Sequence, residues 1–283
     1  MVKNKSFSSY FAPMSINNLQ LGEEFDRIVD QRRSVRIYDT DADFDSSAVT
    51  RSLQRATLAP NSSNLQLWEF FHIKSDEAKK KMAEYCLGQP AASTANELVV
   101  FVTRQDLWKE RADWNLEKVV GSMSNSNKQA EKPKSTRDTG DTLKNIGKDK
   151  DTRKKSVMQY YGKLIPQLYK NDAFGIAGAV KKAYVNFVQG PKKPAYREVG
   201  KEDVRVIVHK SCALAAQTFM LSMTAEGYST CPMEGFDSKR IKKFLNLPSG
   251  AEIGMVVSCG VGKQEGVYGK RLRVNEQQII KEV

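Results

Sequence analysis

The chain has 283 residues, of which 40% are hydrophobic and 28% charged, and its formal net charge is +12. This length and composition support one sizeable hydrophobic core and exclude a fibre or a wholly disordered chain. The four cysteines form no C-x-x-C pair, so we expect free thiols, a reducing cytoplasmic environment and no zinc site. No apolar run approaches the roughly 20 residues of a spanning helix, so we expect a soluble protein without a membrane segment.

Helix signals come first along the chain. Residues 19–31 have amphipathic periodicity, which predicts a helix. Asp45 and Ser46 can cap a second helix that extends to about Leu58. Residues 59–61 (Ala-Pro-Asn) then break it.

Two strands are predicted in the next part of the chain. Residues 68–74 are aromatic and β-branched, which favours a strand, and Ser75 can cap a helix that extends to about Tyr85. The almost continuous apolar run at 97–103 is typical of a central strand that is covered on both faces.

The segment 122–155 has a different composition, rich in Ser, Asn, Lys, Asp, Thr and Gly. Such a segment buries too little apolar surface to offset its ordering entropy, so we expect a flexible surface insertion. Helices are expected again at 157–169 and 173–188. We treat 122–200 as an insertion or lid region within a single domain that covers 1–283.

The longest helical stretch is 203–226, and Gly227 stands where a C′ glycine belongs. Its middle is apolar on nearly every face, so it must be buried all round. We therefore place it at the centre of a dimer. A strand at 228–231, a helix at 238–245 and a strand at 252–259 are expected to follow.

The first chemical motif is Arg32-Arg33-Ser34-Val35-Arg36. Arginine binds phosphate oxygens in a bidentate way, and the hydroxyl of Ser34 adds a short donor. If the segment is extended, Arg32, Ser34 and Arg36 share one face. The alternative is a solvated basic turn.

The second motif is the polar run between the second helix and the first strand. It contains Ser62, Ser63, Asn64 and Gln66. Amide side chains both donate and accept hydrogen bonds, which is the mixture that a flavin pyrimidine edge requires. The alternative is an Asx-rich turn.

The third motif is the loop that contains Pro232, Met233, Glu234 and Gly235. Pro232 stiffens this loop, and Gly235 allows close approach of the backbone to a ligand. Main-chain N–H groups at Glu234 and Gly235 could then reach a flavin N5. The alternative is an ordinary turn between a strand and a helix.

The fourth motif is a basic run near the C-terminus, with Lys270, Arg271 and Arg273. It could complete a phosphate site, or it could be a solvated basic tail. Other chemistry has little support. The two histidines, His72 and His209, are far apart in sequence, and we expect no metal site. There is no P-loop and no GxGxxG fingerprint.

Taken in this order, the four motifs resemble the nitroreductase family of flavoproteins, and the resemblance covers about residues 24–116 and 203–276. It implies an α+β fold, a three-layer α/β/α sandwich with a central, mostly antiparallel sheet. It also implies an obligate homodimer in which both subunits contact each FMN. Leu67 stands where the family usually has proline before Trp68.

The resemblance also implies roles for individual residues. Arg32, Ser34 and Arg271 match the phosphate and ribityl contacts, with Lys270 and Arg273 as neighbouring candidates. The matched contacts to the flavin ring are Arg36 near N1 and O2, Asn64 at the pyrimidine edge, Ser62 and Ser63 from the partner subunit, and Glu234 and Gly235 beside N5.

The function that follows from the resemblance is an FMN-dependent oxidoreductase. NAD(P)H would reduce the flavin, and a nitroaromatic, quinone or similar electron-poor molecule would then be reduced by a ping-pong mechanism. The alternative is a non-catalytic flavin store or sensor. A nucleic-acid partner is disfavoured despite the net charge of +12, because aromatic residues do not interleave with the basic runs.

Overall fold

The centre of the fold is an antiparallel sheet, seen in a computed structural model that describes residues 18–125, 150–170 and 175–283. The described strands are β1 (Trp68–Ile73), β2 (Glu97–Arg104), β3 (Ser229–Met233) and β4 (Ala251–Gly260). They lie in the order β1-β2-β4-β3, and each neighbouring pair is antiparallel. The predicted central antiparallel sheet is therefore confirmed.

Strand β2 is central because its sequence is apolar at successive positions. From Leu98 to Val102 every side chain is fully buried. A strand points alternate side chains to opposite faces, so this run requires cover on both faces of the sheet.

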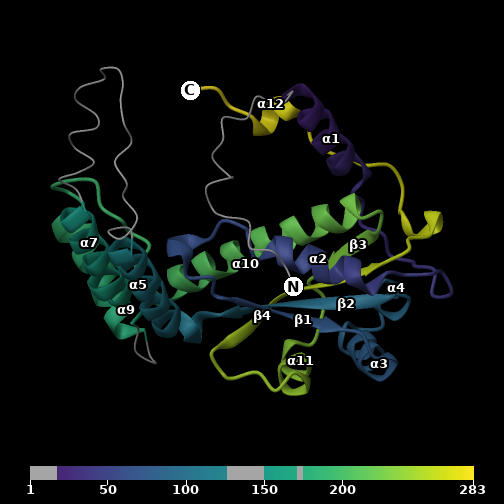
Figure 1. Ribbon diagram of the computed structural model, residues 1–283, viewed down its shortest axis with the longest axis horizontal. Helices are drawn as coiled ribbons and strands as arrows, with labels where there is room; N and C mark the ends of the chain where they lie inside the picture. The colour runs from purple at the N-terminus through teal and green to yellow at the C-terminus, as the bar shows by residue number, and fades with distance from the viewer. Residues whose placement is uncertain (1–17, 126–149, 171–174) are drawn as a thin grey trace.

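Helices α2 (Ser46–Ala56) and α10 (Lys201–Ala225) cover one face (Figure 1). Phe101 of β2 packs against Phe219 of α10, with ring centroids 5.5 Å apart. The same apolar cluster includes Val49 of α2.

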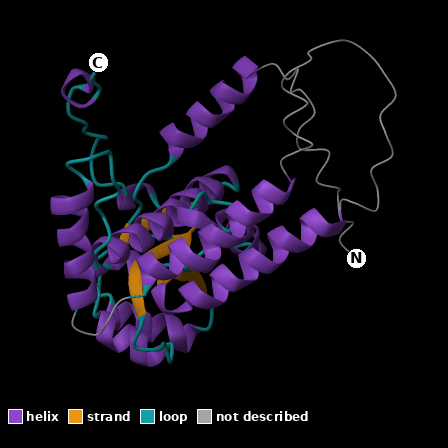
Figure 2. Ribbon diagram, turned by 90° about the vertical axis from the view of Figure 1, so that its left-hand side faces the viewer, coloured by secondary structure: helices purple, strands orange, loops and turns teal. Residues whose placement is uncertain are grey.

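Helices α3 (Asp76–Tyr85), α4 (Pro90–Ser93) and α11 (Ser238–Phe244) cover the other face. Met82 of α3 and Ile241 of α11 are fully buried there. Figure 2 shows the strands at the centre of the molecule with helices around them. The fold is the predicted α+β three-layer sandwich.

Local signals in the sequence set several helix ends. The side chain of Asp45 accepts a hydrogen bond from the Ser47 N–H, and that of Ser75 accepts one from the Ala78 N–H. Gly227 has φ +85°, a backbone conformation that glycine adopts without strain, and it ends α10 as predicted.

The segment 122–155, which we predicted to be flexible, is helical at both of its ends. Helix α5 (Trp108–Asn125) extends into the segment, and α7 (Lys150–Gln159) begins within it. Helix α5 contacts α7 and the π-helical turn after it. Residues 126–149 lie outside the described residues.

The region after α7 is helical as expected. It consists of the π-helical turn η4 (Tyr160–Leu164), α8 (Ile165–Tyr169), α9 (Ile176–Tyr184) and a second π-helical turn, η5 (Val185–Gln189). Ile165 and Tyr169 pack with Val204 and Val208 of α10 in a separate apolar cluster. The other described elements are α1 (Asn18–Gln31), η2 (Ser62–Asn64), η3 (Gln105–Leu107), η6 (Gln264–Gly266) and α12 (Glu276–Ile279).

One described helix, α10, is long and apolar enough to cross a membrane by length and composition. A buried core helix passes the same test of length and composition. Half of its most apolar window is buried within the chain, where it packs against α2 and the sheet.

Candidate functional site

The RRSVR motif follows α1 as an extended segment beside the edge strand β3. Ser34 forms a parallel bridge with Thr230 of β3. The N–H of Val35 donates to the carbonyl of Thr230 at 3.0 Å, and the N–H of Arg36 donates to that of Gly266 at 2.9 Å. These bonds fix the backbone that carries the basic side chains.

Arg271 lies against the start of this segment, although 239 residues separate it from Arg32 in sequence. Its guanidinium donates to main-chain carbonyls at the end of α1, those of Val29 at 3.1 Å, Asp30 at 2.8 Å and Arg32 at 2.8 Å. A cation at this position stabilises the C-terminal end of a helix. The C-terminal basic run is therefore held beside the RRSVR motif.

Four arginines form a cluster, here called the arginine cluster: Arg32, Arg33, Arg271 and Arg273. Burial lowers the pKa of Arg32, and the positive charges of Arg271, Arg273 and Arg33 lower it further. The carboxylate of Asp30 lies 3.5 Å from Arg271 and offsets only one of these charges. The cluster thus carries excess positive charge that a phosphate dianion would neutralise.

Arg36 lies beside this cluster and is partly buried. Its guanidinium carbon is 4.9 Å from the centroid of the Tyr268 ring, a cation–π distance. Burial raises the pKa of the Cys231 thiol, while the charges of Arg36 and Arg32 and a hydrogen bond with Ser34 lower it. Tyr268 was not among the predicted site residues, and no local motif marks it.

The third motif lies next to the first through β3. Pro232 and Met233 are the last residues of β3 and pair with β4, and Met233 is buried. Glu234 and Gly235 follow and are exposed. Gln89 donates from its side-chain amide to the carbonyl of Gly235 at 2.6 Å, which positions this loop.

The second motif is a strained loop. Ser63, Asn64 and Gln66 all have positive φ, at 57°, 51° and 49°. Such angles are uncommon outside glycine and are maintained by surrounding contacts. The amide of Asn64 donates to Asn115 at 3.0 Å, and Asn115 donates back to the Asn64 carbonyl at 2.8 Å.

Within one chain, the second motif lies far from the other three motifs. The N–H of Ser62 donates to Ser211 in the middle of α10 at 3.2 Å. Thr230, the partner of Ser34, follows the C-terminal end of the same helix at Ala225. With a rise of 1.5 Å per residue, Ser211 and Ala225 are about 20 Å apart along the helix axis.

The remaining polar and nucleophilic residues form no second reactive cluster among the described residues. His72 pairs with Glu97, and His209 lies 3.1 Å from Glu252. All four cysteines are free and buried. The described parts of the chain contain no group of three or more His, Cys, Asp or Glu side chains suited to a metal ion.

Comparison with known proteins identifies the family of this chain. The model of the nitroreductase family matches residues 29–263. MhqN of Bacillus subtilis, provisionally named as an NAD(P)H nitroreductase, is 23% identical over 256 residues, which is 89% of this chain and 97% of MhqN. The chain belongs to the nitroreductase family.

Solved structures show the same fold. YdfN of Bacillus subtilis superposes with a TM-score of 0.63 at 17% identity, covering 93% of this chain and 100% of YdfN. A protein from Exiguobacterium sibiricum, solved in complex with FMN, superposes with a TM-score of 0.54 at 20% identity, covering 92% of this chain and 97% of that protein. The α+β sandwich described above is thus the nitroreductase fold.

Proposed function

We propose that this protein is a homodimeric, FMN-dependent oxidoreductase of the cytoplasm that uses NAD(P)H to reduce an electron-poor small molecule. The observation that carries the proposal is the arginine cluster beside β3, in a chain of the nitroreductase family. FMN would supply the hydride chemistry, accepting two electrons from NAD(P)H and passing them to the acceptor in a ping-pong sequence.

The arginine cluster would hold the FMN phosphate. Arg32 has excess positive charge around it, and its pKa is lowered by burial and by that charge, so an anion would relieve the repulsion. Arg271 is anchored to the end of α1, so it would contribute mainly fixed charge. Ser34 would donate its hydroxyl to the phosphate or ribityl oxygens, and Arg33, Lys270 and Arg273 would add further positive charge.

Arg36 would lie beside N1 and O2 of the flavin. Its position over Tyr268 restricts the guanidinium, so its charge would be fixed near an atom that becomes negative upon reduction. The Pro232–Gly235 loop would place main-chain N–H groups beside N5. Gln89 supports this role because it fixes the Gly235 carbonyl and hence the orientation of the loop.

The dimer is supported by two exposed apolar side chains on α10. Val206 is 50% exposed and Leu214 is 47% exposed. A second copy of the chain would cover them, since obligate interfaces bury apolar surface of this kind. It would also bring Ser62 and Ser63 of one subunit to the arginine cluster of the other, which a single chain does not achieve.

Reductive titration of the purified protein tests the proposal. NADH or NADPH, added in the absence of oxygen, should bleach the visible absorbance of the oxidised flavin. An electron acceptor added afterwards should restore it. Bound flavin that neither nucleotide bleaches would instead indicate a flavin store or sensor. Absence of flavin after reconstitution would overturn the proposal.

A further inference from the structure

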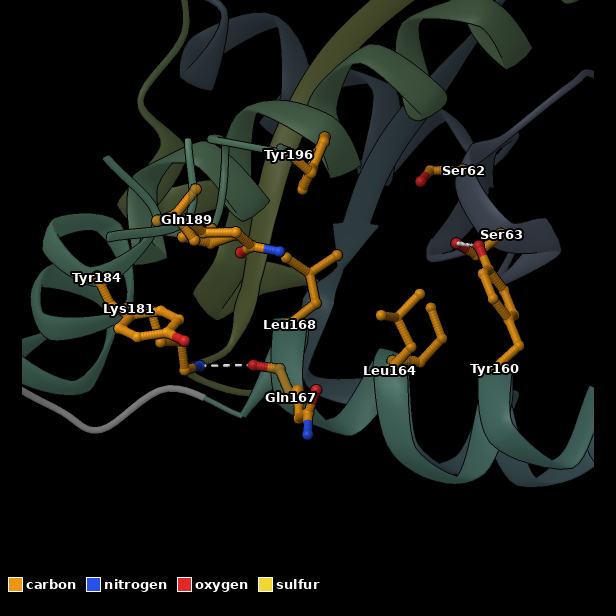
Figure 3. Close-up of a pocket in the computed structure, with 13 residues that line it drawn as sticks. Ser62, Ser63, Tyr160, Leu164, Gln167, Leu168, Lys181, Tyr184, Gln189 and Tyr196 are labelled. Carbon is orange, nitrogen blue, oxygen red and sulfur yellow. Dashed lines mark hydrogen bonds between the residues drawn. The ribbon is translucent and has the colours of Figure 1, made fainter. Parts of the chain in front are cut away.

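Helix α9 and the π-helical turn η5 form one continuous helix over residues 176–189, and its two faces differ. The inner face borders a cavity, with Lys181, Val185 and Gln189 in the cavity wall. The ammonium of Lys181 donates to the carbonyl of Gln167 of α8 at 2.6 Å, a bond drawn in Figure 3, which holds this face against α8. The opposite face of the helix therefore points away from the cavity.

This outer face is apolar and exposed. Ile176, Val180 and Phe187 are 63%, 64% and 82% exposed, and Val188 beside them is also exposed. Spacings of four and seven residues place the first three side chains on one face of a helix. These four described residues, here called the α9 stripe, lie outside the cavity wall. Apolar side chains gathered on one exposed face mark an interaction surface.

Positive charge accompanies the α9 stripe. Residues 150–200 contain eleven lysines and arginines against three acidic residues, so they carry a formal net charge of +8 out of the +12 of the whole chain. Lys192 and Lys193 are exposed in the turn that follows η5. Arg197 donates to the side chain of Asn186 at 2.7 Å, which holds its guanidinium against η5. Basic side chains therefore lie at the C-terminal end of the stripe.

An anionic lipid surface matches both the apolar and the basic character of this region. A helix with an apolar face and flanking Lys and Arg lies in the plane of a membrane interface, where its apolar side chains enter the boundary between headgroups and acyl chains. A second copy that packed stripe against stripe would bring two regions of charge +8 together, which repel. A nucleic acid would match the charge but would leave the aliphatic side chains without apolar contacts.

We propose that the α9 stripe and its basic neighbours dock this protein onto a membrane surface that is rich in anionic phospholipids. Residues 176–189 are about 20 Å long as a helix, too short for a hydrocarbon core of about 30 Å, so the contact is peripheral and reversible. Figure 1 shows α9 at one end of the molecule, where a flat surface can approach it. The proposal does not depend on bound FMN, because the stripe is separate from the arginine cluster.

The test is co-sedimentation of the purified full-length protein with vesicles of phosphatidylcholine that contain about 30% phosphatidylserine, compared with vesicles of phosphatidylcholine alone. We expect at least about tenfold stronger binding to the anionic vesicles, and weaker binding as salt rises. Val180→Glu places a charge in the middle of the stripe and should weaken this binding at least about tenfold. Ile279→Glu on α12 is the matched control, because Ile279 is also 64% exposed, and it should bind as the unmodified protein does.

A pair of double variants tests the basic neighbours. Lys192→Glu with Lys193→Glu should weaken binding to the anionic vesicles. Lys239→Glu with Lys243→Glu makes the same charge change at exposed positions of α11 and should have a much smaller effect.

Further measurements keep the test decisive. Phe187→Ser shortens the most exposed side chain of the stripe without adding charge, and it should weaken binding even if Val180→Glu folds poorly. No binding of the unmodified protein to anionic vesicles, or equal losses in the stripe variants and their controls, would overturn the proposal. A changed oligomeric state of Val180→Glu by light scattering, with vesicle binding intact, would also overturn it and assign the stripe to a second copy of the chain.

Discussion

Replacement of Arg32 by alanine should weaken FMN binding without lowering the stability of the apoprotein. Burial lowers the pKa of Arg32, and the positive charges of Arg271, Arg273 and Arg33 lower it further. In the absence of a phosphate these like charges repel, so Arg32→Ala should leave the melting temperature of the apoprotein unchanged or slightly raise it. Functional sites commonly carry this kind of destabilising charge.

We expect Arg32→Ala to weaken the binding of FMN. A hydrogen bond to a charged group contributes about 1.5–3 kcal/mol, so the dissociation constant of FMN should rise about 10- to 150-fold. Arg32→Lys should recover part of this loss, because it keeps the charge without the bidentate fork. The effect should shrink at high salt, since partly exposed charges are screened.

The assay is fluorescence titration of the apoprotein with FMN, together with thermal unfolding of the apoprotein. Arg27→Ala is the matched control, because it removes the same charge from the exposed side of α1, outside the arginine cluster. A lowered apoprotein melting temperature with unchanged FMN affinity would show that Arg32 is a structural residue, and it would refute the phosphate role of the cluster.

Three further predictions follow from other contacts. Arg36→Ala should lower the two-electron potential of the bound flavin by about 30 mV for each tenfold loss of relative stabilisation, with partial recovery in Arg36→Lys, and potentiometric titration measures it. Glu226→Gln should lower stability by about 1–2 kcal/mol, because hydrogen bonds from Arg51 and Arg55 lower the pKa of this carboxyl to about 2. Since its folded pKa is depressed, Glu226 stabilises the fold above its unfolded pKa of about 4.5, and this contribution is lost as pH falls toward 2; unfolding curves of the variant should lack that acid dependence. Leu214→Arg, on the exposed face of α10, should give a monomer by light scattering that binds FMN weakly, whereas a flavin-loaded active monomer would contradict the proposed dimer.

The sequence predicted helix ends and strands well where neighbouring residues determine them. The cap at Ser75 and the C′ glycine at Gly227 act within a few residues, so the sequence shows both helix ends. The apolar run of β2 likewise indicates a strand covered on both faces. The helices at the two ends of the 122–155 segment are not visible in its polar composition.

For the candidate site, too, the sequence shows the local motifs but not how the fold brings them together. The arginine motifs are visible in the sequence, but their convergence depends on Arg271 reaching the end of α1 from 239 residues away. Tyr268 and Gln89 lie in no motif, and only the tertiary fold places them beside Arg36 and Gly235. The π-helical turns η4 and η5 were not predicted, because a one-residue change in hydrogen-bond register leaves little trace in hydrophobic periodicity.

The central claim is that the arginine cluster and its neighbours hold FMN. The most direct measurement is heat release of the cofactor from purified protein, after reconstitution with a mixture of FMN and FAD, followed by chromatography and quantitation against chain concentration. The account predicts FMN, at about one molecule per chain, and not FAD, because the chain has a basic cluster for a phosphate but no dinucleotide fingerprint. Release of FAD, or of no flavin at all, would contradict it.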